Sequence, residues 1–185
     1  MDRVAGKIGE ITGLQYFGYP SSFWLFQDPW FRQATTVQFG NLHGGYFTPW
    51  VIPFISRIKK TVWRLSDMWP FTGHCSYSYK CERWKTGCGK CPLLNEYPLL
   101  RRDTTRFLWW WKRFLYRCSK LTIVATSQWM LNQLKESPLL GGFERVYIPN
   151  GVDPSSFFWM KERKKEIRKE LHLPEEDFLT LAYDP

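Results

Sequence analysis

Apolar residues occur in short runs, and segments rich in polar residues, glycine and proline separate these runs. Four runs predict buried strands, at residues 35–40, 61–65, 121–126 and 145–149. Helical periodicity lies between or beside them, at residues 3–11, 48–60, 103–115, 128–135 and 161–171, and a further strand is predicted at 179–183. Strands that alternate with helices indicate an α/β fold with a Rossmann-like parallel sheet.

The clearest helix follows Asp103, which is expected to be its N-cap. One helical stripe combines the apolar residues Phe107, Leu108, Trp111, Phe114 and Leu115. This stripe predicts core packing, as does the shorter stripe of Ile52, Ile55 and Ile58 in an earlier helix. The run of three tryptophans at 109–111, followed by two basic residues, leaves a membrane-surface helix as the alternative.

Composition bounds the class of protein. The 185 residues are 44% hydrophobic and 18% aromatic, which excludes a disordered chain. The net charge of +9 favours anionic partners, such as nucleic acid, an acidic membrane surface or phosphorylated ligands, although a merely soluble basic surface would look the same. The N-terminus lacks the apolar segment of a secretory signal, and no run is long enough to span a bilayer, so we expect a cytoplasmic protein.

Four of the five cysteines, Cys75, Cys81, Cys88 and Cys91, lie in one short loop. The last two form a C-x-x-C pair, and four thiolates are a set that structural zinc prefers. Two disulfides or four free thiols are the alternatives, and a reducing compartment favours metal over disulfides. The spacing matches neither common ferredoxin pattern. Cys118 is expected to be an ordinary buried thiol.

Polar and glycine residues follow three of the predicted strands. Parallel α/β sheets bind ligands where strands end, so the segments after the first three strands are expected to line one cleft. The candidates are Asn41, His43, Gly44, Gly45, Asp67, Trp69 and Ser127. Each of three candidates has an alternative role. Asp67 could equally cap a loop, and His43 could merely hold a loop in place. Trp69 could stack on a sugar or pack in the core. His74 and His172 are expected to have no site role.

Two motifs carry a resemblance to a known family. The residues 127–129 (Ser-Gln-Trp) and 146–153, which contain Ile-Pro-Asn-Gly-Val-Asp before Phe157 or Phe158, resemble the domain junction of GT-B glycosyltransferases of family 4. Residues 67–75 (Asp-Met-Trp-Pro-Phe-Thr-Gly-His-Cys) and 87–92 (Gly-Cys-Gly-Lys-Cys-Pro) resemble a cysteine-bearing branch of that family.

The resemblance implies an incomplete enzyme. Residues 1–148 would be part of the acceptor-side domain, 149–160 the interdomain linker, and 161–185 the truncated start of the donor domain. Asn150, Gly151 and Asp153 would form the hinge. The complete enzyme would move a sugar, with retention of configuration and no catalytic metal, from a nucleotide sugar to a glycan or lipid-linked acceptor. The resemblance implies a role in polysaccharide biosynthesis, in the cytoplasm and at the inner face of the membrane. No nucleic-acid partner is expected.

One position departs from the family pattern. Many members have a His-Asp pair where this chain has Ser66 and Asp67, and serine offers no imidazole. Either another group takes its place, with His43 the nearest candidate by loop position, or the activity is altered. Two rival functions stay open: a zinc-stabilised basic module that binds nucleic acid, and a catalytically inactive membrane adaptor built on the tryptophan helix.

Overall fold

The computed structural model describes residues 2–156 and 163–174. Its sheet has four parallel strands in the order β1-β2-β3-β4. They are β1 (Thr36–Phe39), β2 (Lys60–Leu65), β3 (Thr122–Ala125) and β4 (Glu144–Tyr147). The α/β, Rossmann-like prediction is therefore confirmed for these four strands, whereas the strand expected at 179–183 lies outside the described residues.

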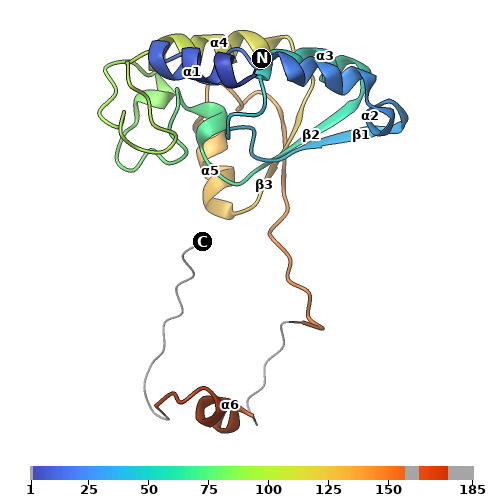
Figure 1. Cartoon of the computed structure of the whole chain (residues 1–185), viewed down its shortest axis with the longest axis vertical. Coiled ribbons are helices and arrows are strands. Elements are labelled where there is room, and N and C mark those ends of the chain that lie inside the picture. Colours follow the sequence, from blue (N-terminus) through green and yellow to red (C-terminus); the bar gives the residue numbers. More distant parts are fainter. Residues whose placement is uncertain (1, 157–162, 175–185) are drawn as a thin grey trace. The chain divides into compact units, whose positions relative to one another are not determined.

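Helices pack on both faces of this sheet. Figure 1 shows α3 and α4 on one side and α5 on the other. The α-helices are α1 (Asp2–Thr12), α2 (Pro29–Gln33), α3 (Ile52–Ile58), α4 (Thr105–Arg117), α5 (Gln128–Glu136) and α6 (Lys164–Glu170). Short 3₁₀ helices are η1 (Pro20–Gln27), η2 (Pro49–Val51), η3 (Trp69–Phe71) and η4 (Arg83–Lys85). In the part of the chain that the structure describes, no helix is long and apolar enough to cross a membrane.

Local chemistry explains where several helices begin. The carboxylate of Asp28 accepts from the backbone N–H of Phe31, and Pro29 occupies the first turn of α2. The hydroxyl of Ser127 accepts from the backbone N–H of Met130 and so caps α5. Neither η1 nor α2 was predicted from the sequence, because both are too short to show a helical period.

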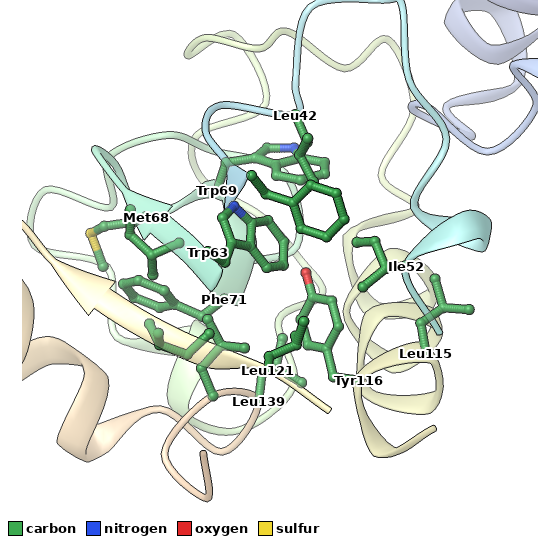
Figure 2. Packing of buried hydrophobic residues seen from close by; sticks show 14 of the residues in the cluster. Leu42, Ile52, Trp63, Met68, Trp69, Phe71, Leu115, Tyr116, Leu121 and Leu139 are labelled. Carbon is green, nitrogen blue, oxygen red and sulfur yellow. The ribbon is translucent and has the colours of Figure 1, made fainter. Parts of the chain in front are cut away.

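The core packs against helices α3 and α4 and also includes Met130 and Leu134 of α5. Its centre is Trp63 of β2, which is fully buried and packs edge-on against the rings of Phe39 and Tyr116. Figure 2 shows Trp63 surrounded by side chains from the sheet, from α4 and from the turn after β2. The indole N–H of Trp63 donates to the carbonyl of Gly40 at 2.9 Å, so its polar atom is satisfied despite the burial.

Two predicted apolar stripes are only partly correct. Phe107 and Phe114 of α4 are exposed, and so is Ile58 at the end of α3, whereas Leu108 and Leu115 are buried as expected. The buried face of α4 instead includes Lys112, which is 1% exposed. The pattern failed because a long aliphatic stem lets a lysine pack in the core if its amine finds acceptors.

The start of α4 also differs from the prediction by one residue. Thr104 is the N-cap, and Asp103 precedes it. The Asp103 carboxylate still accepts from the backbone N–H of Thr105 at 3.1 Å and from its hydroxyl at 2.7 Å. Its other oxygen accepts from the backbone N–H of Cys91 at 2.7 Å, so the same carboxylate joins the helix to the cysteine loop.

The chain divides into two compact units, Met1–Asn150 and Gly151–Pro185. The boundary falls between Asn150 and Gly151, within the segment interpreted as a hinge. In the second unit, the Asp153 carboxylate accepts from the backbone N–H and hydroxyl of Ser155 and from the hydroxyl of Ser156. These bonds form a local turn, and its role as a hinge stays a prediction.

Candidate functional site

The parallel sheet brings the loops after β1 and β2 together at one edge. Nε2 of His43 lies 2.6 Å from Oδ2 of Asp67, although 24 positions separate the two residues in the chain. The other carboxylate oxygen of Asp67 accepts from the backbone N–H of Trp69 at 2.9 Å. Both carboxylate oxygens are thus used, and we call His43 and Asp67 the strand-edge pair.

The imidazole of His43 has one committed nitrogen and one free nitrogen. A carboxylate can only accept, so in the neutral imidazole the proton between the two side chains belongs to Nε2, and Nδ1 carries the lone pair. Nδ1 is buried and has no hydrogen-bond partner. A buried basic nitrogen that is oriented by a carboxylate through its other side is the arrangement of a general base.

Two aromatic rings flank the imidazole. The ring centroids of Trp69 and Tyr97 each lie 5.6 Å from that of His43. Trp69 is 1% exposed, and its indole N–H donates to the side chain of Gln15 at 3.1 Å, so it forms a buried wall of the site. Tyr97 is 61% exposed and offers the open ring beside His43. Sequence reasoning missed Tyr97 because it lies in an irregular segment without a motif.

A groove opens next to Tyr97. Its walls come from α1, from the loop after it, from Gly45 and from residues 97–100. The residues that line it are Asp2, Arg3, Gly6, Lys7, Gly9, Glu10, Gln15, Tyr16, Tyr19, Gly45, Tyr97, Pro98, Leu99 and Leu100. Of the residues predicted for a common cleft, Gly45 lines this groove, and Tyr97 joins it to the strand-edge pair.

The remaining predicted cleft residues have other structural roles. The carbonyl of Asn41 accepts from the hydroxyl of Tyr46, and the ring of Tyr46 packs closely over Gly44, where a Cβ would come within 2.7 Å of it. Ser127 caps α5 after β3, at the same edge of the sheet as the pair. These three residues shape the edge, and their predicted contact with substrate stays a prediction.

Lys112 of α4 is a buried cation behind the site. Its ammonium donates to the carbonyls of Trp69 (2.7 Å) and Thr72 (3.2 Å), and it lies 3.6 Å from the centroid of the Trp69 ring. Burial lowers the pKa of Lys112 from 10.5 to about 7, while the nearby Cys88, Cys75 and Asp67 act in the opposite direction. The hydroxyl of Tyr116 donates to the carbonyl of Pro70 at 2.8 Å, so α4 holds the whole turn that follows Asp67.

The loop that carries the four cysteines folds around a pocket of its own. Cys75, Cys81, Cys88 and Cys91 all line one small pocket together with His74, and we call this group the cysteine pocket. All four are free thiols. Backbone N–H groups point at two of the sulfurs, from Gly73 to Cys88 at 3.2 Å and from Leu93 to Cys91 at 3.4 Å.

Burial shifts the pKa values of the thiols and of the imidazole in the cysteine pocket. It raises the pKa of the Cys75 thiol to about 11 and that of Cys88 to about 12, and it lowers the pKa of His74. Within the described residues, no three His, Cys, Asp or Glu side chains already lie close enough together to hold a metal ion. The zinc site expected from the spacing therefore stays a prediction, although its four sulfurs share one pocket. Cys118, at the end of α4, is only partly buried, so the expectation of a buried thiol there is wrong.

Comparison with known proteins gives one similarity. Over 73 residues, the chain is 42% identical to a protein of Escherichia coli (strain K12) described as "Putative colanic acid biosynthesis glycosyl transferase WcaC". The matched segment covers 36% of this chain and 18% of that protein, so the match spans less than a fifth of the relative's length. No protein-family model and no solved structure matches the chain. The similarity supports a glycosyltransferase relationship and nothing narrower.

Proposed function

We propose that this chain is the acceptor-side part of a retaining GT-B glycosyltransferase of family 4. The complete enzyme would move a sugar from a nucleotide sugar to a glycan or lipid-linked acceptor in the biosynthesis of a polysaccharide. The partial identity to WcaC and the motifs at the domain junction support this proposal. The observation that carries it is the contact between His43 and Asp67 at the carboxyl edge of the sheet.

The proposed role of the strand-edge pair follows from its geometry. When the acceptor oxygen bonds to the anomeric carbon, the bond from that carbon to the diphosphate breaks, and the acceptor hydroxyl loses its proton. Nδ1 of His43 would take this proton, and Asp67 would stabilise the imidazolium through Nε2. Tyr97 and the groove beside it would hold the acceptor sugar, because an exposed aromatic face matches the C–H face of a pyranose.

Saccharide binding to the strand-edge pair tests this function without a donor. Methyl glycosides and short oligosaccharides are titrated into the full 185-residue chain labelled with ¹⁵N-histidine. We expect saturable shifts of the His43 ring signals, and we expect His43→Asn to weaken binding. His172→Asn alters an exposed histidine of the second unit and is the matched control. Saccharides that bind equally well to the His43→Asn chain would contradict the proposal.

We also propose a peripheral contact with the anionic inner face of the cytoplasmic membrane. The outward face of α4 exposes Phe107, Trp110 and Phe114, and Arg106 and Arg117 on the same helix are exposed too. Aromatic side chains interleaved with arginines are typical of helices that lie in a lipid interface. Cosedimentation with vesicles that contain phosphatidylglycerol is the test, and Phe114→Ser should reduce the bound fraction. Equal binding to purely zwitterionic vesicles at high salt would contradict an anionic lipid partner.

A further inference from the structure

The cysteine pocket contains one donor more than a tetrahedral ion can use. Four sulfurs and the imidazole of His74 surround the same space. Zinc in structural sites almost always takes four ligands from Cys and His. One of these five groups therefore has to stay outside any such ion, and the structure distinguishes the candidates.

His74 has the hydrogen-bonding pattern of a metal ligand. It is 1% exposed, and its Nδ1 lies 2.9 Å from the carbonyl oxygen of Pro98. Because a carbonyl only accepts, Nδ1 carries a proton and the lone pair of the neutral ring lies on Nε2. A metal-bound histidine commonly donates its other N–H to such a carbonyl, which fixes the ring and its tautomer.

The distance from His74 to Cys91 fits two ligands of one ion. Nε2 of His74 lies 3.4 Å from the sulfur of Cys91. Zinc bonds of about 2.3 Å to sulfur and about 2.0–2.1 Å to nitrogen, at a tetrahedral angle, place the two donor atoms about 3.5 Å apart. The observed pair thus already has the separation that a shared zinc ion would require.

Three of the four thiols in the cysteine pocket differ from the fourth in their exposure to solvent. Cys81, Cys88 and Cys91 are partly exposed, so an ion can reach them from solvent. Cys75 is buried and directly follows His74 in the chain. Its carbonyl accepts from the hydroxyl of Thr72 at 2.6 Å, which ties it into the turn after β2.

We propose that the cysteine pocket binds one Zn²⁺ ion through Nε2 of His74 and the sulfurs of Cys81, Cys88 and Cys91, with Cys75 as a buried thiol outside the set. The thiols release their protons on binding, and their side chains turn toward the ion, since no three donors are yet assembled in the described residues. Four protein ligands leave no open position, so the ion is structural. It pins the loop to the segment that directly follows η3.

Metal titration of the full, reduced chain tests the ligand set. Purified chain is analysed for bound zinc and then titrated with Co²⁺, whose visible spectrum reports tetrahedral thiolate coordination. We expect one equivalent of metal for the wild type and for Cys75→Ala. His74→Ala should weaken binding by more than the roughly 10–100-fold that the loss of an outer-shell partner causes. His172→Ala and Cys118→Ala are the matched controls and should bind as the wild type does.

A second readout avoids any dependence on whether a variant folds. In the wild-type chain labelled with ¹⁵N-histidine, added Zn²⁺ should shift the Nε2 signal of His74 and leave that of His172 in place. Normal binding by His74→Ala together with loss of binding in Cys75→Ala would establish a four-thiolate site and overturn the proposal. Less than about a tenth of an equivalent of metal in the wild type would overturn it as well.

Discussion

The strand-edge pair and the cysteine pocket each contain a buried histidine, but the two regions are held in different ways. His43 is positioned by a carboxylate on a neighbouring loop, and regular parallel pairing of β1 with β2 fixes both loops. His74 is positioned by a backbone carbonyl within an irregular loop that has little secondary structure. The comparison indicates that a sheet can preform a site, whereas a long irregular loop needs cross-links to do the same.

Replacing Trp69 should have the largest effect, because its ring is buried and contacts both the strand-edge pair and the buried Lys112. It contacts the His43 ring on one side and the ammonium of Lys112 on the other. Trp69→Ala is expected to lower the free energy of unfolding by about 3–5 kcal/mol, as for large-to-small substitutions in other cores. Urea denaturation under reducing conditions measures it.

Trp30→Ala is the control for this substitution. Trp30 is 83% exposed, so its loss should change the free energy of unfolding by no more than about 0.5 kcal/mol. If Trp69→Ala costs less than about 1 kcal/mol, the buried wall of the strand-edge pair does not stabilise the fold, and the prediction is wrong.

Removing the charge of the strand-edge pair should affect one region and not the other. In Asp67→Asn the ionised partner of Nε2 is lost, and a buried imidazole is left with a poorer acceptor. We expect a loss of about 1–3 kcal/mol in the free energy of unfolding, together with shifted ring signals of His43. The ring signals of His74 should keep their positions in NMR spectra. Equal shifts for both histidines would mean that the regions are coupled.

Lys112 predicts a pH dependence of stability. Its folded pKa, about 7, lies below its unfolded value near 10.5, so between these values the unfolded chain binds more protons than the native chain. The free energy of unfolding should therefore rise with pH above 7, by at most about 1.4 kcal/mol per pH unit. From about pH 8 upward the buried thiols Cys75 and Cys88, whose pKa is raised from 9.0 on folding, act in the opposite direction.

The pH window from 7 to 8 consequently isolates the lysine. Unfolding free energies measured across this window should rise with pH for the wild type, and Lys112→Met should reduce this slope. Lys120→Met alters an exposed lysine and should leave the slope as it is. An unchanged slope in Lys112→Met would show that the amine does not titrate in this range.

The smallest expected signal is nucleotide-sugar binding by the chain alone. Asp67 places a negative charge at the strand edge, and such a charge disfavours a diphosphate there. The donor groups of the proposed enzyme would belong to its second domain. Calorimetry with UDP- and GDP-sugars should give a Kd no tighter than about 1 mM, about −4 kcal/mol. Saturable micromolar binding would place a donor site in this chain and contradict the proposed division of roles.

The periodic part of the fold was predictable because it depends on local patterns. The apolar runs gave all four strands, and Ser127 marked the start of α5, since an N-cap and its helix are neighbours in the chain. The site was predictable only in part. Parallel strands end at one edge, and this rule correctly brought His43 toward Asp67. The same rule gave no information on Tyr97. This residue lies beside His43 because of the irregular path of the segment between β2 and α4.

The sequence by itself determined which elements form, because hydrophobic period and capping chemistry act over a few residues. Only the tertiary structure decided that Lys112 is buried while Phe107 and Phe114 are exposed. That choice depends on two carbonyls, of Trp69 and Thr72, about 40 positions away, which accept from the ammonium. Satisfying a buried polar group is a property of the whole fold, since its partners come from segments that only folding brings together.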